Sequence, residues 1–221
     1  MASYRRMFSS SIGTKVLIGT TGLLLFLYLL LHLAGNLLVF AGQETFNEYA
    51  HTLISNPLVV PAEIGLLAVF VVHIYKAVRM WLRNQAARPV GYEQKRWAGH
   101  TSRKTLSSAT MIWTGLLILV FVGVHLQQFK FGPWYEIGDP PVRDLYRTEA
   151  DVFTSPIWVG VYVLCMILVG LHLRHGISSA FQSLGADHPV YTKRLVTGGT
   201  IVAVLIAAGF AIIPIWIYLT R

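Results

Sequence analysis

The chain has 221 residues, of which 54% are hydrophobic and 13% are charged, and its formal net charge is +8. A soluble domain has about 25% charged residues, so this composition excludes an ordinary soluble domain and indicates an integral membrane protein. The positive charge does not indicate nucleic-acid binding, because the basic residues cluster beside apolar stretches, as they do in the cytoplasmic loops of membrane proteins.

Five apolar stretches are each long enough to cross a bilayer as a helix, which takes ~20 residues. In chain order they cover about residues 15–42, 57–83, 106–129, 156–184 and 195–219. No long polar stretch is left over to form a separate soluble domain. The sequence therefore predicts an all-α membrane protein, with residues 1–221 forming a single bundle of five transmembrane helices.

The links between these spans alternate in charge. Residues 1–15, 84–105 and 186–194 carry Lys and Arg, whereas the link 43–57 has neither. The longer link 130–155 is mixed in charge and is predicted to be an ordered external loop at the membrane interface. Since positively charged links stay in the cytoplasm, we expect a cytoplasmic N-terminus and a C-terminus outside.

A short motif occurs in both the first and the third span. Thr-Gly-Leu-Leu begins at Thr21 and again at Thr114, and in each copy seven uncharged residues then lead to a histidine, His32 or His125. The threonine precedes its histidine by about three helical turns, so both lie on the same helix face. The glycine of each motif removes side-chain bulk where a helix or a flat cofactor must approach closely. Ionisable side chains inside a span are functional candidates by default.

The second and fourth spans also contain one deep histidine each, His73 and His172. At ~1.5 Å of rise per residue, His32 and His125 share an outer depth, and His73 and His172 share an inner depth. Two imidazoles facing each other are what a non-covalent b-type haem requires. The sequence predicts two haem b groups, with these histidines as iron ligands. For any single histidine, a hydrogen-bonded core role or a proton relay is the alternative.

Further residues near these histidines are candidates for the same sites. His175 lies three residues after His172 and is an alternative ligand. Lys76, Arg79 and Arg174 follow the inner histidines and could hold haem propionates.

Two other residues bear on the function: Glu63, which has several candidate roles, and the single cysteine, which excludes some kinds of site. Glu63 near the start of the second span could contact quinone or relay protons, or it could cap its helix. The single cysteine, Cys165, excludes an intrachain disulfide, paired-cysteine haem attachment and a cysteine cluster for zinc or iron–sulfur.

Taken in order, these motifs resemble the dihaem cytochrome b subunit of succinate:quinone oxidoreductases, of the single-chain, five-span type that anchors bacterial succinate dehydrogenases and fumarate reductases. The resemblance extends from about residue 9 to residue 219. It rests on Thr-Gly-x9-His32-Leu-x-Gly-Asn, His73 with the basic residues after it, Thr-Gly-x9-His125, and Leu-His172-x3-Gly176.

The resemblance implies an outer haem held by His32 and His125 and an inner haem held by His73 and His172. It implies electron transfer to quinone, with menaquinone expected, in a bacterial cytoplasmic (inner) membrane. The implied partners are a flavoprotein subunit with covalent FAD and an iron–sulfur subunit, docked on the basic cytoplasmic links. Succinate would be oxidised in the flavoprotein, so this chain would have no dicarboxylate chemistry of its own.

Several alternatives stay open at this point. The complex could run in reverse as a fumarate reductase, or the chain could be the haem b subunit of another quinone-linked enzyme, such as a hydrogenase or formate dehydrogenase. A different class is a haem-free proton-coupled transporter that uses His32, His73 and Glu63 as a relay. Glu44 and Glu48 are further quinone candidates, and the oligomeric state of the complex is not indicated.

Overall fold

The computed structural model describes residues 10–87, 90, 105–186 and 188–221. Five helices are long and apolar enough to cross a membrane, which confirms the predicted all-α fold with five spans. The span bounds agree with the prediction to within a few residues. The spans are α2 (Ser11–Asn36) with the 3-10 turn η1 (Leu37–Ala41), α4 (Val59–Ala86), α5 (Leu106–His125) with the π-turn η2 (Leu126–Lys130), α7 (Pro156–Ser183) and α8 (Thr192–Thr220).

Local sequence signals set where these helices begin. The Ser10 hydroxyl accepts a hydrogen bond from the backbone N–H of Gly13 at 3.0 Å and caps α2. Thr105 and Ser108 form a reciprocal capping box at the start of α5. Pro156 stands in the first turn of α7, where its missing N–H costs no helical hydrogen bond.

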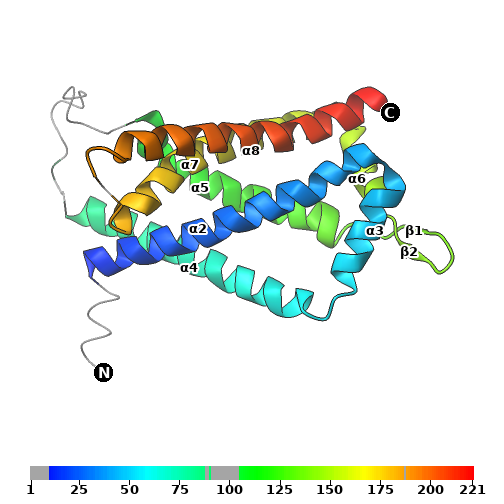
Figure 1. The fold of residues 1–221 in the computed structure, drawn as a ribbon, viewed down its shortest axis with the longest axis horizontal. Helices are drawn as coiled ribbons and strands as arrows, with labels where there is room; N and C mark the ends of the chain where they lie inside the picture. Colours follow the sequence, from blue (N-terminus) through cyan, green and yellow to red (C-terminus); the bar gives the residue numbers. More distant parts are fainter. Residues whose placement is uncertain (1–9, 88–89, 91–104, 187) are drawn as a thin grey trace.

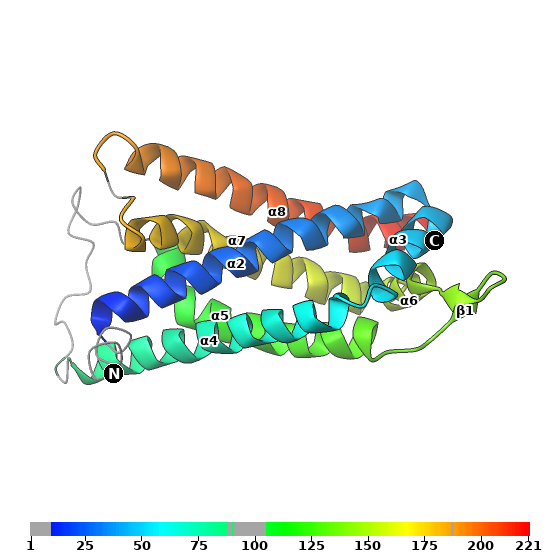
Figure 2. The same ribbon diagram turned by 60° about the horizontal axis from the view of Figure 1, so that its bottom comes forward.

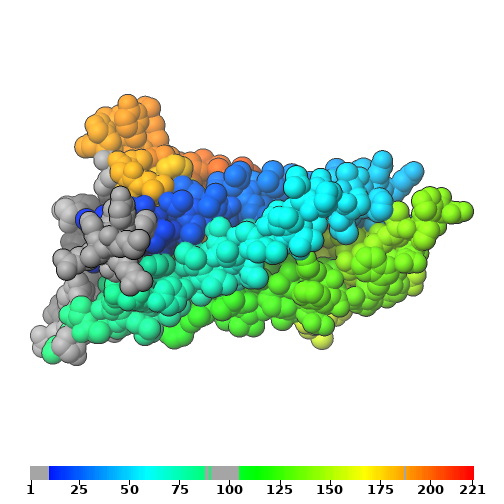
Figure 3. Space-filling view, turned by 90° about the horizontal axis from the view of Figure 1, so that it is seen from below, coloured from blue at the N-terminus to red at the C-terminus, as the bar shows by residue number. Residues whose placement is uncertain are grey.

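Four of the spans form a ring, and the fifth lies outside it. Helix α2 packs against α4 and α7, and α5 packs against α7 and more lightly against α4. Helix α8 covers α7 and α2 on the side away from α4 (Figures 1 and 2). The space-filling view shows α4 between α2 and α5 on one face of the bundle (Figure 3). In this ring α2 stands diagonally opposite α5, and α4 stands diagonally opposite α7.

The links at one end of the bundle have more structure than the sequence indicated. The link 43–57 contains a helix, α3 (Gln43–Ile54), and the loop 130–155 contains the antiparallel strands β1 (Glu136–Ile137) and β2 (Val142–Arg143), followed by α6 (Leu145–Phe153). Helices α3 and α6 contact each other at the end where α8 finishes (Figure 1). Both helices are short and amphipathic, so the sequence contains no long apolar run that would predict them. Phe46 of α3 and Phe153 of α6 share one buried apolar cluster.

A buried carboxylate, Asp144, joins α3 to α6. It is 3% exposed and accepts hydrogen bonds from the side-chain amides of Gln43 at 2.7 Å and Asn47 at 2.8 Å. It also accepts from the backbone N–H of Arg147 at 3.0 Å, which caps the start of α6. The side-chain oxygen of Asn47 in turn accepts from the backbone N–H of Tyr146.

Replacing Asp144 by alanine should lower the free energy of unfolding by about 3 kcal/mol, because the buried amide of Asn47 and the half-buried amide of Gln43 lose their acceptor. Thermal unfolding of the detergent-purified chain measures the change. Asp151→Ala is the matched control, since among the described residues the partner of this carboxylate is Arg147, in an exposed ion pair at 3.9 Å, and such pairs contribute little. Equal losses in the two variants would show that Asp144 does not hold these helices together.

The basic link 84–105, predicted as a docking surface for partner subunits, lies mostly outside the described residues. The link 186–194 is described apart from residue 187. It lies at the end of the bundle opposite α3 and α6, where α2 begins (Figure 1).

Candidate functional site

The two inner histidines each contact a Thr-Gly pair on a neighbouring helix. Nδ1 of His73 on α4 lies 3.1 Å from Oγ1 of Thr21 on α2. Nδ1 of His172 on α7 lies 3.2 Å from Oγ1 of Thr114 on α5. The same contact is thus made twice, by α2 with α4 and by α5 with α7. The motif repeated in the first and third spans therefore positions the histidines of the second and fourth.

The glycine of each motif leaves room for the imidazole. A Cβ placed on Gly22 would lie 3.2 Å from Cε1 of His73, and one placed on Gly115 would lie 3.2 Å from Cε1 of His172. Both distances are shorter than ordinary van der Waals contact. The close approach predicted for these glycines is therefore the approach of a histidine ring to the helix backbone.

The hydrogen bonds of the threonine hydroxyls indicate which nitrogen of each inner ring carries the proton. The hydroxyl of Thr21 donates to the backbone carbonyl of Leu17 at 2.6 Å, so its oxygen can only accept from His73. The hydroxyl of Thr114 is directed to the carbonyls of Thr110 and Met111 at 3.2 and 3.1 Å. We therefore assign the proton to Nδ1 in both rings from the hydrogen-bond network. This leaves Nε2 with a free lone pair, as metal coordination requires.

The inner histidines belong to diagonally opposite helices of the ring, and they are close enough to interact electrostatically. His175, the alternative ligand, makes no side-chain hydrogen bond with any described residue. His172 is the residue placed like His73, beside a threonine and a glycine of the repeat. The geometry therefore favours His172 over His175 as the inner ligand on α7.

The outer histidines, His32 on α2 and His125 on α5, lie next to each other. Their ring centroids are 5.8 Å apart, and the ring planes are perpendicular. Two imidazoles on opposite sides of one metal ion would have ring centres roughly 6 Å apart, given metal–nitrogen bonds of ~2 Å. Nδ1 of His125 is buried without a hydrogen-bond partner among the described residues. Aromatic rings surround the pair: Tyr28, Phe121, Phe129, Tyr162 and Phe210.

His32 differs from the inner histidines in its hydrogen bond. Its Nδ1 lies 3.3 Å from the side-chain amide nitrogen of Asn36, which also donates to the backbone carbonyl of His32 at 2.7 Å. Because an amide nitrogen only donates, Nδ1 accepts here and the ring proton lies on Nε2. To coordinate a metal through Nε2, His32 would have to move its proton to Nδ1 and give up this contact.

The two histidine pairs therefore fit haem iron to different degrees. In the inner pair, the assigned tautomer leaves Nε2 of each ring free to coordinate a metal, and the threonine contacts hold both rings in place. The outer pair has a suitable separation but needs a change of tautomer at His32. Within the described ranges no group of three or more His, Cys, Asp and Glu side chains could hold a metal ion. The candidate metal ligands are thus paired histidines.

The three predicted propionate contacts lie in different surroundings. Lys76 follows His73 by about one helical turn on α4. Arg79 donates to the hydroxyl of Tyr75 at 3.2 Å. Arg174 is about 200° around α7 from His172 and lines a cavity between α7 and α8. Arg174 therefore faces a different neighbouring helix from the ligand that it was expected to accompany.

Glu63 forms an ion pair with Lys130, which links α4 to η2 at the α3/α6 end of the bundle. Glu63 is also close enough to Tyr28 to interact electrostatically. The Tyr28 ring stacks on His32 with centroids 5.4 Å apart and planes 12° apart. Glu63 is thus part of a polar group beside the outer histidines. Glu44 and Glu48, the other predicted quinone candidates, lie exposed on α3.

Sequence reasoning missed a buried carboxyl, Glu149 on α6. It is 6% exposed, and its Oε2 has no hydrogen-bond partner in the described part of the chain. Burial raises the pKa of Glu149 to about 8. Glu149 interacts electrostatically with Tyr162, whose hydroxyl donates to Gln128 at 2.7 Å and whose ring centroid is 6.2 Å from that of His125.

The sequence did contain one signal for this residue. Glu149 stands four residues after Leu145 and four before Phe153, which puts it on the apolar side of α6. The signal could be read only once 145–153 was known to be a helix.

Comparisons of the chain with protein-family models, with curated proteins and with solved structures found no match. The function proposed below is therefore supported by the residues and contacts of this chain and by the resemblance of its motifs.

Proposed function

We propose that this chain is the membrane-anchor cytochrome b subunit of a succinate:quinone oxidoreductase in a bacterial cytoplasmic membrane, with two b-type haems and a cytoplasmic N-terminus. The observation that carries the proposal is the repeated Thr–His contact of the inner pair. It presents two imidazoles from diagonal helices, each with Nε2 free for iron. The adjacent outer histidines on the other diagonal support a second site.

The chain's own residues orient the ligands and exclude water. Thr21 and Thr114 hold the inner rings through Nδ1, and Gly22 and Gly115 let these rings lie against the helix. Such contacts fix the orientation of a ligating histidine and raise its basicity. Bound haem would supply one-electron transfer, with a potential set by burial and hydrogen bonding around histidine ligands.

We place quinone reduction, with menaquinone as the expected quinone, at the α3/α6 end of the bundle. Quinone reduction consumes protons as well as electrons, so it needs groups that exchange them. Glu63, Lys130 and Tyr28 form a polar group beside His32 between α2, α4 and α5. Glu149 supplies a second carboxyl, which interacts electrostatically with Tyr162, and the Tyr162 ring lies beside His125.

The flavoprotein and iron–sulfur partners would dock at the opposite end of the bundle, near the inner pair. Described residues at that end include the cations Arg83, Lys193 and Arg194. Succinate oxidation is the direction we propose, and fumarate reduction is the same electron path in reverse.

The transporter alternative receives less support from the contacts. It needs His32, His73 and Glu63 to act as one relay, but each has a different hydrogen-bond partner. His73 bonds to Thr21, His32 to Asn36, and Glu63 to Lys130. These bonds do not connect the three groups into a chain.

Purification of the tagged full chain from its native membrane tests the proposed partners. We expect a flavoprotein with covalent FAD and an iron–sulfur subunit to copurify, and succinate to reduce a menaquinone analogue. In the His73→Ala variant, quinone reduction should fall at least tenfold, while succinate oxidation by a soluble dye that accepts electrons from the flavoprotein continues. Copurification of a hydrogenase or formate dehydrogenase subunit would overturn the succinate assignment and leave the haem assignment standing.

A further inference from the structure

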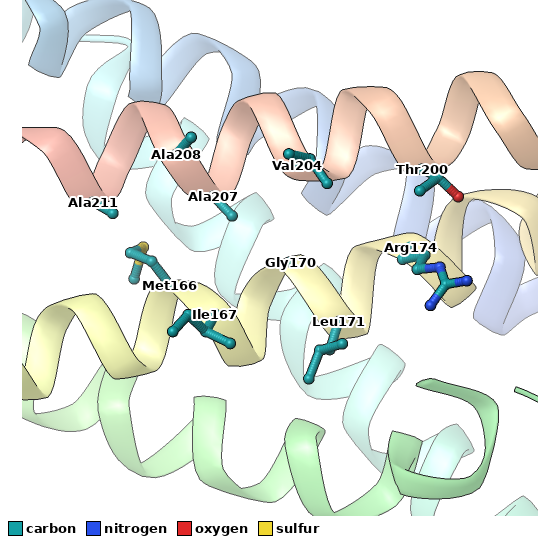
Figure 4. A pocket seen from close by; sticks show the side chains of 10 residues that line it. All are labelled: Met166, Ile167, Gly170, Leu171, Arg174, Thr200, Val204, Ala207, Ala208 and Ala211. Carbon is teal, nitrogen blue, oxygen red and sulfur yellow. The ribbon is translucent and has the colours of Figure 1, made fainter. Parts of the chain in front are cut away.

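A cavity of about 430 Å³ opens between α7 and α8 on the outside of the four-helix ring (Figure 4). Its lining runs along α7 from Met166 to Arg174 and along α8 from Thr200 to Ala211. These stretches correspond to lengths of roughly 12 and 16 Å along the two helices. The cavity is therefore elongated along the membrane normal, and Arg174 and Thr200 lie at one end of it.

Small residues allow α7 and α8 to approach each other here. A Cβ on Gly170 would lie 3.0 Å from Cβ of Ala207, so the helices are in close contact at this level. Ala208 and Ala211 add little bulk to the α8 wall, while Ile167, Leu171 and Val204 supply larger apolar walls (Figure 4). This open apolar groove, called the channel below, fits a flexible hydrocarbon chain.

Among the described residues that line the cavity, Arg174 is the one charged group. Its side chain is exposed, and it makes no ion pair or hydrogen bond with any described residue. The hydroxyl of Thr200 donates to the backbone carbonyl of Val196 at 2.8 Å, so it is not free to donate a hydrogen bond to a ligand. The guanidinium of Arg174 is therefore the hydrogen-bond donor that this end of the cavity offers to a ligand.

The depth of Arg174 in the membrane favours an anionic binding partner. Helix α7 has 28 residues, or ~42 Å, which exceeds a ~30 Å hydrocarbon core by ~6 Å at each end. Arg174 lies nine residues before Ser183, which places its Cα roughly 8 Å inside the hydrocarbon boundary. An arginine at this depth extends its side chain toward the interface. A phosphate there can accept two parallel hydrogen bonds from the guanidinium.

We propose that this cavity binds one anionic phospholipid, with an acyl chain in the channel and the phosphodiester on Arg174. Lys193 and Arg194 on α8 lie toward the same end of the bundle and favour an anionic headgroup over a zwitterionic one. The tail of a quinone would fit the channel, but its neutral ring would leave the charge of Arg174 unpaired. This site is independent of the haem assignment.

Native mass spectrometry of the full chain tests the site. The chain is delipidated in detergent and titrated with phosphatidylglycerol or with phosphatidylcholine of the same acyl chains. We expect one tightly retained phosphatidylglycerol and no comparable phosphatidylcholine. Arg174→Gln should weaken phosphatidylglycerol retention about tenfold, as expected for a lost charge-assisted hydrogen bond. Ala208→Phe, which fills the channel from an exposed position, should weaken retention of the same lipid.

Two control variants separate the site from general effects. Lys193→Gln removes one positive charge at the same end of the bundle but outside the cavity lining, and Leu205→Phe adds bulk on a side of α8 outside the lining. Leu205→Phe should retain phosphatidylglycerol like the wild type, and Lys193→Gln should weaken its retention much less than Arg174→Gln does. The proposal is wrong if Arg174→Gln retains this lipid unchanged, if Lys193→Gln weakens retention equally, or if a neutral quinone displaces it without dependence on Arg174.

Discussion

Replacing His172 by alanine should remove one of the two proposed b-type haems from the chain and about half of its b-type absorbance. In the structure His172 is the inner histidine of α7 that is held by Thr114 and fitted against Gly115. Alanine removes this proposed ligand, and no described residue on α7 is placed to replace it. A reduced-minus-oxidised spectrum, combined with the haem-to-protein ratio of the purified chain, measures the loss.

Two further variants test whether His172, and not His175, is the haem ligand on α7. His175→Ala should retain both haems, because that ring lacks the threonine contact. Thr114→Val keeps the side-chain shape but removes the hydroxyl, and it should weaken haem binding about 10- to 100-fold, the usual effect of losing a partner of a metal ligand. If His175→Ala lost a haem while His172→Ala kept both, the inner pair would be misassigned.

The folded chain should lose stability as the pH rises from 5 to 8 because of Glu149. Burial raises the pKa of this carboxyl to about 8 in the folded state, whereas in the unfolded chain it titrates near 4.3. Between these values the folded state holds a proton that the unfolded state has released, so unfolding becomes more favourable with rising pH. Each pKa unit corresponds to about 1.4 kcal/mol, so the effect amounts to several kcal/mol. Above pH 8 this group adds no further change.

Glu149→Gln should flatten that part of the profile, because glutamine stays neutral throughout. Thermal unfolding in detergent at pH 5, 6, 7 and 8 gives the comparison. Glu48→Gln is the matched control: Glu48 is exposed on α3, and its replacement should leave the wild-type slope unchanged. Parallel profiles for the wild type and Glu149→Gln would show that Glu149 is not held in its protonated form.

The sequence predicted the spans well because their physical requirement is simple. A bilayer demands a long apolar helix, and five such runs were visible with bounds within a few residues of those observed. It also predicted that His32 and His125 would share a depth, since the helical rise converts residue number into distance. The structure places these two rings 5.8 Å apart.

Contacts between helices could not be predicted in the same way. The repeat suggested that Thr21 and His32 act on one face, but it did not indicate that Thr21 would hold His73 on another helix. Such a contact depends on which helices are neighbours and on their rotation. Arg174 illustrates the same limit. It was predicted to accompany His172 because the two residues are close in sequence, but it lies on the other side of α7. Helices α3 and α6 were missed because they are short and not span-like in composition.

The most direct test of the cytochrome proposal is the number of haems on the purified wild-type chain. A reduced-minus-oxidised spectrum identifies b-type haem, and haem extraction against protein concentration gives the stoichiometry. We expect two b haems per chain, one for each histidine pair. A folded preparation with no haem and no b-type spectrum would contradict the proposal. The paired histidines would then have a role without haem, as hydrogen-bonded core residues or in a proton relay.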